Sequence, residues 1–206
     1  ESTRPGAKAI SLNDEINRVI PVIKGIRSVS SIPISIDTYK SEVAKKALDS
    51  GANIINDISG LNFDSKMIEI VKEYNVPIVI MHIKGTPLNM QVNPHYDNII
   101  DEIISYFEKR INLCLDYGIP KTHIILDPGI GFGKQLNDNF ILIRKLNLFA
   151  ELGYPILIGP SRKSFIGLTL DLPVNDRLEG TSAAITASIM NGARIIRVHD
   201  VLEMKR

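Results

Sequence analysis

The sequence is poor in several features that would mark a specialised class of protein. It has one cysteine, Cys114, and no tryptophan among its 206 residues. It therefore cannot form an internal disulfide, and we expect a reducing compartment, the cytoplasm. The longest apolar stretch, Val76–Ile83, spans eight residues even with Pro77 and His82 counted, whereas a membrane helix needs ~20. The chain begins at Glu1, with neither an initiator Met nor an apolar leader, so we expect it to be part of a longer protein.

The sequence also has no large excess of either positive or negative charge. There are 24 Lys and Arg against 23 Asp and Glu, a net charge of +1, and no run of like charges, which argues against a nucleic-acid surface. The His and acidic residues lack the spacing of a zinc site, and no Ser-His-Asp order or nucleophile elbow is present. The 14 Gly and 11 Pro are the ordinary share of a globular protein. We therefore predict one globular domain with neither nucleic acid nor membrane as a partner.

Isoleucine, by contrast, is abundant, with 34 copies, and many fall in short runs bounded by turn residues. Continuous β-branched runs are typical of strands that are buried on both faces of a parallel sheet. The predicted strands are Ile32–Ile36, Asn53–Ile58, Val76–Met81, His123–Leu126, Pro155–Ile158 and Arg194–Val198.

Helical patterns alternate with these strands. The clearest runs from Asp97 to Tyr117, where apolar residues recur at steps of three and four and Cys114 lies on the apolar stripe. Pro21 predicts a kink or a late start in the first helix. The other predicted helices are Leu12–Arg27, Lys40–Ser50, Asp64–Tyr74, Asp138–Leu152 and Thr181–Asn191.

The spacing of the polar residues at the strand ends predicts the architecture. The five steps from Asp37 to Arg197 average 32 residues, so eight such units would need about 256 residues, close to the ~250 of a (β/α)8 barrel. A chain of 206 residues holds about six units. The alternative is a six-stranded doubly wound sheet, which concentrates its ligand residues at one switch point. Polar residues end every predicted strand, which favours the barrel.

Three strand ends carry acids or amides within recognisable motifs. Asp127 begins DPGIGFGK, Asp37 lies in IDTYK, and Asn56 lies in NIINDISG. Each could cap a helix or close a turn, and Thr38 could cap the second helix, which would leave Asp37 free. In a barrel, however, the three would converge on one mouth, where carboxylates suit a flat heterocycle with N–H donors, such as a pterin or a purine.

Basic and hydroxyl residues follow the later strands. Ser161–Lys163 could donate to ring atoms and to a second ligand. Arg197 and His199 fall on one face and form a candidate phosphate clamp. STRPGA near the start offers another hydroxyl and guanidinium, and Lys84–His95 is a long loop that we interpret as a lid. We interpret His82 as a packed strand-end histidine and Cys114 as a core residue.

Together these strings resemble one family, the dihydropteroate synthases. The matching motifs are ESTRPGA, SIDTYK, NDISG, MHIKGTPLNMQ, DPGIGFGK, SRKS, RLEGTSAA and RVHD, in family order from Glu1 to Asp200. The resemblance implies a (β/α)8 TIM barrel and a transferase of a non-methyl alkyl group. Such an enzyme condenses 6-hydroxymethyl-7,8-dihydropterin pyrophosphate with p-aminobenzoate to give dihydropteroate and pyrophosphate in folate biosynthesis. It also implies Mg²⁺, sulfonamide inhibition and a homodimer.

The resemblance assigns roles to thirteen residues, of which Asp37, Asp127 and Lys163 would be catalytic. It places the pterin against Asp37, Asn56, Ile58, Met81, Asp127 and Lys163. It places the pyrophosphate against Thr3, Arg197 and His199. It places p-aminobenzoate against Thr3, Arg4, Pro5, Phe132, Ser161 and Lys163.

The chain also departs from the family pattern. It starts at ESTRPGA, so we expect a single pterin-binding domain over residues 1–206 that lacks the first two strands and the end of the last helix. The family's magnesium-binding Asn would lie in the missing first loop, so no metal ligand is expected in this chain, and we expect little synthase activity from it alone. Two alternatives are a pterin-binding methyltransferase domain, which needs no pyrophosphate clamp, and a non-catalytic fragment of the synthase.

Overall fold

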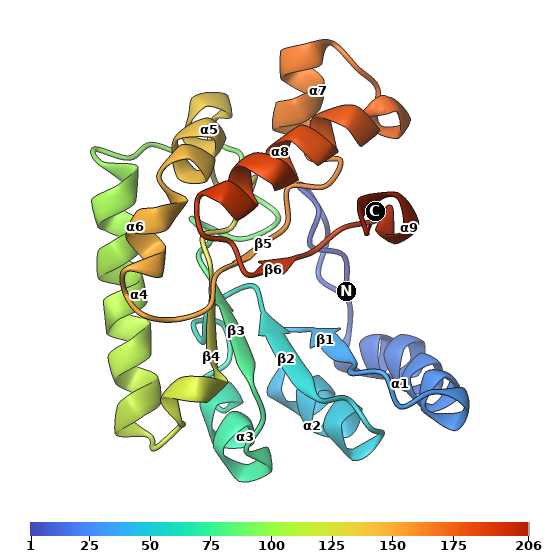
Figure 1. The fold of residues 1–206 in the computed structure, drawn as a ribbon. Coiled ribbons are helices and arrows are strands. Elements are labelled where there is room, and N and C mark those ends of the chain that lie inside the picture. The colour runs from blue at the N-terminus through green and yellow to red at the C-terminus, as the bar shows by residue number, and fades with distance from the viewer. Residues whose placement is uncertain (206) are drawn as a thin grey trace.

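Six short parallel strands form the centre of the computed structural model, which describes residues 1–205. Figure 1 shows them between helices that cover the outside of the sheet. The strands follow the chain in order, and each is separated from the next by at least one helix, as predicted. They are β1 (Ser35–Asp37), β2 (Ile54–Asp57), β3 (Ile78–Met81), β4 (Ile124–Asp127), β5 (Leu157–Ile158) and β6 (Ile195–Ile196).

The strands are neighbours in sequence order, which is the topology of a barrel wall. β1 to β4 form one sheet and β5 pairs with β6, all in parallel. A parallel bridge from Leu126 to Ile156 joins the two sheets. The chain order excludes the doubly wound alternative, whose strand order reverses at a switch point. The carboxyl ends of all six strands therefore face the same side.

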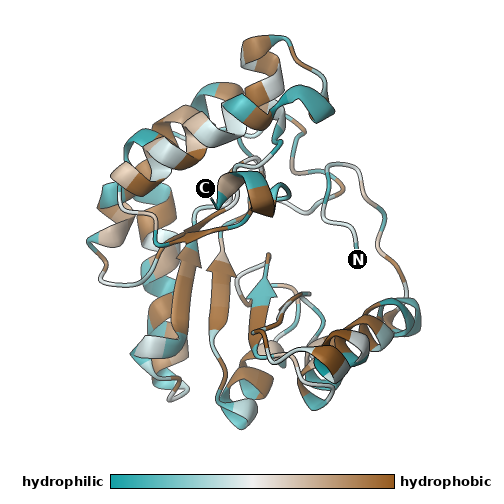
Figure 2. Cartoon of the chain, turned by 45° about the vertical axis from the view of Figure 1, so that its right-hand side comes forward, coloured by the Kyte–Doolittle hydropathy of each residue, from teal (hydrophilic) through white to brown (hydrophobic). Residues whose placement is uncertain are grey.

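The longer helices before β5 bury apolar side chains against the core of the fold. In α4 (Ile99–Asp116), Ile103, Phe107 and Cys114 are fully buried, which confirms the prediction for Cys114. Figure 2 shows apolar strands in the centre of the fold. The other helices are α1 (Leu12–Val29), α2 (Ser41–Asp49), α3 (Met67–Tyr74), α5 (Leu136–Arg144), α6 (Leu146–Ala150), α7 (Ser164–Leu170), α8 (Leu178–Met190) and α9 (Val201–Met204), with 3₁₀ turns at Lys121–His123 and Val174–Asp176.

Several predicted boundaries were wrong. The first strand begins at Ser35, not Ile32, because Pro33 has no N–H for a sheet ladder. The helix predicted over Asp138–Leu152 is two helices, since the backbone of Lys145 (φ −107°, ψ 19°) leaves the helical region between α5 and α6. The helix predicted from Thr181 begins at Leu178, and α7 was not predicted.

Two predictions about the first two helices were also wrong. Of the two alternatives predicted for Pro21, the late start is wrong, because α1 already begins at Leu12 and runs through Pro21; the Ser11 side chain caps it by accepting from the amide of Asp14 at 3.1 Å. Thr38 does not cap α2. Instead Asp64 accepts from the Ser41 amide at 2.8 Å. Among the described residues, no helix combines the length and the apolar character needed to cross a membrane.

Candidate functional site

One cavity of about 910 Å³ lies at the carboxyl ends of the strands. It collects side chains from the N-terminal segment, from the ends of β1 to β4 and from the loops that follow β5 and β6. All thirteen residues singled out from the motifs line it: Thr3, Arg4, Pro5, Asp37, Asn56, Ile58, Met81, Asp127, Phe132, Ser161, Lys163, Arg197 and His199. The structure thus brings the whole predicted set together, while their individual roles stay predictions.

Acids and an amide form one wall of the cavity. Asn56 donates through Nδ2 to Oδ1 of Asp37 at 2.8 Å, because Asp37 and Asn56 are register partners in neighbouring strands. Oδ1 of Asn56 is buried and accepts nothing from the part of the chain that the structure describes. A buried acceptor without a donor is costly in a folded protein. This wall therefore has unused acceptor capacity for N–H groups of a ligand.

Asp127, at the end of β4, is the most buried acid of this wall. It is 6% exposed, and its Oδ1 accepts from the amide of Gly129 at 2.7 Å. Burial raises its pKa to about 6, although the Gly129 amide and the cations Lys163, Lys134 and Arg197 oppose that shift. Gly129 (φ +72°) is required here because a Cβ would lie 2.0 Å from the carbonyl oxygen of His82.

Lys163 faces Asp127 from the loop before α7. Its ammonium donates to the carbonyl oxygen of Ile130 at 2.8 Å and lies 4.0 Å from the centre of the Phe132 ring. Burial lowers its pKa to about 8, against the opposing attraction of Asp127. A cation on an aromatic face next to a carboxylate can donate to a ligand on either side. Lys163 thus stands between the acidic wall and the aromatic side of the cavity.

Basic side chains line the part of the cavity next to Asp37. Arg197 pairs with Asp37 at 2.6 Å, and both are partly exposed (55% and 33%), so a ligand can displace this ion pair at little cost. His199 contacts the hydroxyl of Ser161 through Nδ1 at 3.0 Å. Arg162, which we expected to meet a second ligand, instead donates through Nε and Nη2 to the two carboxylate oxygens of Asp200.

A buried lysine, Lys134, supports the DPGIGFGK loop. Lys134 is 3% exposed and donates to the carbonyl oxygens of Phe132 (2.9 Å) and His82 (3.2 Å), and it lies 2.9 Å from Nδ1 of His82. Burial, together with the neighbouring Lys134 charge, lowers the pKa of His82 to about 2. His82 is therefore a neutral, packed residue, in agreement with its predicted role.

Sequence reasoning missed several residues of the cavity rim. Met90 and Ile130 line the cavity, as do Glu1 and Ser2. The loop that we interpreted as a lid lies against the site: Pro87 accepts from the amide of Gly6 at 2.9 Å, and Gln91 donates to the carbonyl oxygen of Gly131. All four lie inside motifs already quoted, but the apolar side chains of Met90 and Ile130 carried no chemical signal of their own.

The donor set does not form a cation cage. No group of three or more His, Cys, Asp or Glu side chains among residues 1–205 could hold a metal ion. The two strand-end acids of the cavity are already engaged, Asp37 by Arg197 and Asn56, and Asp127 by the Gly129 amide. The chain's own residues therefore do not fit a resident metal.

Comparison with known proteins identifies the family. The family model described as pterin binding enzyme matches residues 1–199. The dihydropteroate synthase of a Synechocystis strain is 46% identical over 205 residues, which are 99% of this chain and 71% of the relative. The chain belongs to the dihydropteroate synthase family. This assignment favours the synthase over the methyltransferase alternative, and the function of the chain is dihydropteroate synthesis in folate production.

Solved dihydropteroate synthases have the same fold. The Yersinia pestis synthase, in a complex with a sulfonamide drug, superimposes with a TM-score of 0.96 at 39% identity. This match covers 100% of this chain and 74% of that one. The Clostridium difficile synthase, crystallised in the presence of pteroic acid, gives a TM-score of 0.93 at 43% identity and covers 100% and 76%. The family is a TIM barrel, so the predicted (β/α)8 class is confirmed, and six of its βα units lie in this chain.

Proposed function

We propose that the cavity binds 6-hydroxymethyl-7,8-dihydropterin pyrophosphate and p-aminobenzoate side by side and joins them. The observation that carries this proposal is the division of one cavity into an acidic wall, an aromatic and lysine side, and a basic side. These three surfaces match a flat heterocycle with N–H donors, an arylamine and a polyanion, respectively.

The pterin belongs on the acidic wall in this proposal. Its N–H groups donate to Asp127 and to the free Oδ1 of Asn56, while Ile58 and Met81 pack on the ring faces. Asp37, released from Arg197 when the anion binds, completes the wall. A carboxylate accepts two parallel N–H bonds, so this edge discriminates a pterin from a heterocycle with acceptors there.

The basic side holds the leaving group. Arg197, His199 and Thr3 would bind the pyrophosphate, and preorganised donors aimed at developing charge lower the barrier to its departure. When the C–O bond at the pterin methylene breaks, pyrophosphate takes the electron pair. Asp37 and Asp127 stabilise the positive charge that develops on the pterin.

The arylamine attacks that methylene from the Phe132 side. Its nitrogen forms the new C–N bond and then loses a proton, which makes the enzyme a transferase of a non-methyl alkyl group. Phe132 would stack on the ring, Lys163 and Ser161 would hold polar atoms, and Thr3, Arg4 and Pro5 would close the site. Sulfonamides resemble p-aminobenzoate and would occupy this position. The single buried cysteine agrees with a cytoplasmic site of action.

In this proposal, Mg²⁺ binds only together with the substrate. Mg²⁺ commonly binds through substrate phosphates with few protein ligands. It would arrive on the pyrophosphate and neutralise part of its charge. Since the described residues form no cage, we assign no metal ligand to this chain.

We further propose a homodimer that uses the α7–α8 face. Exposed apolar side chains gather at these helices, and Leu168 (70% exposed) and Met190 (82%) are the most exposed of them. Several exposed apolar side chains on one face are typical of an interaction surface. Light scattering on the whole protein tests this: Met190→Glu should shift a dimeric mass toward that of the monomer, and a monomeric wild type would refute the proposal.

Product formation tests the proposed function. The whole protein, with both substrates and Mg²⁺, should release pyrophosphate and yield dihydropteroate, identified by mass spectrometry. Omitting p-aminobenzoate should abolish the product. Arg197→Met should slow turnover severely, while Lys45→Met, on the exposed face of α2, should leave it unchanged. Pyrophosphate release that does not depend on the arylamine would contradict the proposal.

A further inference from the structure

Only part of the IDTYK motif lines the cavity. Asp37 faces the cavity, but Lys40 extends to a buried cluster on the other side of the motif. The Lys40 ammonium donates to Glu1 (2.6 Å), to Glu15 (2.8 Å) and to the carbonyl oxygen of Ile10 (2.8 Å). An ammonium has three protons, so all of its donors are used.

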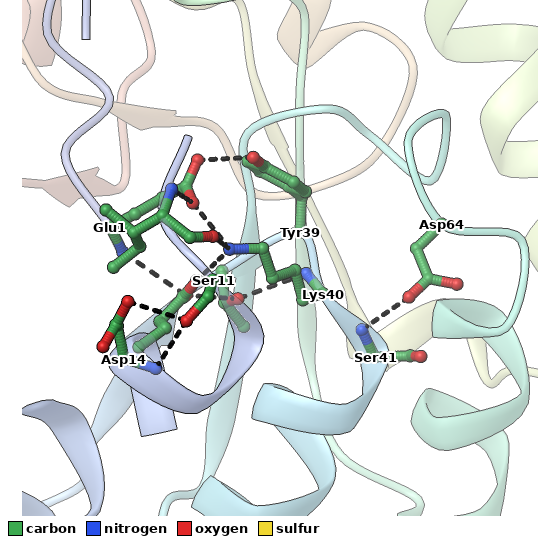
Figure 3. A network of polar contacts seen from close by, with 10 residues as sticks. Glu1, Ser11, Asp14, Tyr39, Lys40, Ser41 and Asp64 are labelled. Atoms are coloured by element: carbon green, nitrogen blue, oxygen red, sulfur yellow. Dashed lines mark hydrogen bonds and ion pairs between the residues drawn. The ribbon is translucent and has the colours of Figure 1, made fainter. Parts of the chain in front are cut away.

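Both carboxylates of the cluster are satisfied from the same motif. Figure 3 shows Lys40 between the N-terminal segment and α1, with the hydroxyl of Tyr39 reaching the Glu1 carboxylate. Glu1 also accepts from the amide of Ile10 at 3.1 Å. Thr38 donates to Glu15 at 2.8 Å. Thr38, Tyr39 and Lys40 thus bind the carboxylates of Glu1 and Glu15, which belong to different segments of the chain.

The cluster is shielded from solvent. The side chains of Lys40, Glu1 and Glu15 are 19%, 6% and 1% exposed. Burial works against the charge of Lys40, but the hydrogen bonds to Glu1 and Glu15 outweigh it and leave the pKa of Lys40 raised. Removing one partner from such a cluster leaves the others buried without compensation. Surface ion pairs, by contrast, contribute little.

Glu1 directly precedes Ser2–Pro5, which line the cavity. This segment has few anchors of its own. Beyond Glu1, the next described backbone bond to another part of the chain is from the amide of Gly6 to Pro87 at 2.9 Å. The Glu1 side chain, held by Lys40, Tyr39 and the Ile10 amide, is therefore one anchor of the segment that places Thr3 and Arg4 over the cavity.

We propose that Lys40 is a positioning residue for the arylamine side of the site: by binding Glu1 and Glu15 together, it fixes the Ser2–Pro5 segment over the cavity. This inference rests on the proposed function, because it assumes that Thr3, Arg4 and Pro5 contact p-aminobenzoate. It does not require Lys40 to touch either substrate. The expected signature is a selective loss of arylamine binding.

Lys40→Met in the whole protein is the principal test. We expect the KM for p-aminobenzoate to rise about tenfold, because a displaced segment weakens binding of this substrate. The affinity for a pterin without pyrophosphate should stay within about twofold of wild type, since Asp127 and Asn56 are not touched. Lys40→Arg, which keeps the charge and the donors, should recover part of the loss.

Lys45→Met is the matched control. Lys45 lies in α2, the helix that Lys40 directly precedes, but its pair with Glu73 is long (3.7 Å) and exposed (41% and 58%). Its KM values should equal those of wild type. If Lys40→Met also leaves the KM for p-aminobenzoate unchanged, or weakens both substrates equally, the proposal is overturned.

A second variant covers the case in which Lys40→Met does not fold. Tyr39→Phe removes only the hydroxyl bound to Glu1 and keeps the ring, which packs edge-on against Phe63 with centroids 5.3 Å apart. It should raise the KM for p-aminobenzoate about threefold and leave pterin affinity unchanged. An unchanged KM would then overturn the proposal. An inactive wild type would instead refute the proposed function, so the two failures are distinguishable.

Discussion

Replacing Asp127 by Asn probes the acidic wall with little change of shape. The carboxylate is buried, and one oxygen already accepts from the Gly129 amide at 2.7 Å. The amide oxygen of Asn can keep that bond. The NH2 group must then face the cavity, where it meets the pterin's own donors. The substitution therefore removes an acceptor from the ligand and places a donor against a donor.

The expected cost follows from the burial of the group. Loss of a buried, charged hydrogen-bond partner in a complex costs about 2–4 kcal/mol. At ~1.4 kcal/mol per factor of ten, this is about 30- to 700-fold in the Kd of the pterin substrate. Part of the effect is offset because the neutral Asn does not have to be stripped of water as a charge. We therefore expect the lower half of that range.

Isothermal titration calorimetry of the whole protein with the pterin substrate measures this change. The melting temperature of the variant should stay close to that of wild type or rise, because an amide is buried more easily than a carboxylate. An unchanged Kd for the pterin would remove Asp127 from the binding site and refute the reasoning. A weaker Kd together with a large loss of thermal stability would instead indicate a structural role for the carboxylate.

Three further predictions concern pH, coupling and the core. Burial raises the pKa of Asp127 to about 6, so its carboxylate form is lost as the pH falls through 6. The pterin affinity of the wild type should therefore drop between about pH 7 and about pH 5, and Asp127→Asn should lack this drop. Equal pH profiles of pterin affinity in the two proteins would contradict this. A sulfonamide should bind much more tightly once pyrophosphate is present, because the anion next to Arg4 orders the Ser2–Pro5 segment. The affinity for pyrophosphate should rise by the same factor when the sulfonamide is bound. Equal calorimetric affinities for the sulfonamide with and without pyrophosphate would refute the coupling. Phe107→Ala, at a fully buried position of α4, should lower the free energy of unfolding by about 3–5 kcal/mol in urea denaturation, whereas Leu115→Ala, at a position 42% exposed, should cost less than about 1 kcal/mol.

The periodic parts of the fold were predictable from the sequence. Isoleucine runs bounded by turn residues located all six strands, because a strand buried on both faces leaves a continuous apolar signature. The acids at the strand ends were predictable for the same reason, since parallel strands place their carboxyl ends on one side. Helix α4 was the most clearly predicted helix, because Ile103, Phe107 and Cys114 lie on one apolar face.

Features that depend on tertiary contacts were not predictable. The first strand was located, but its bounds were wrong, because the Ile32–Ile36 run did not show that pairing with β2 begins only after Pro33, at Ser35, and extends to Asp37. Helix α7 is short and contains Gly167, so it has no strong periodic signal. The partner of Arg162 was missed because Asp200 is 38 residues away. The Lys40 cluster joins Glu1, Glu15 and Lys40 from three segments, and no local pattern reports such a contact.

A crystal structure of the whole protein with dihydropteroate bound tests the central claim most directly, namely that the strand ends hold the pterin and the Phe132 side holds the arylamine. We predict the pterin ring against Asp127 and Asn56, with its N–H groups within hydrogen-bond distance of both side chains. The p-aminobenzoyl ring should lie on Phe132 beside Lys163. Density for the pterin outside this wall, or the reverse orientation of the two rings, would contradict the account.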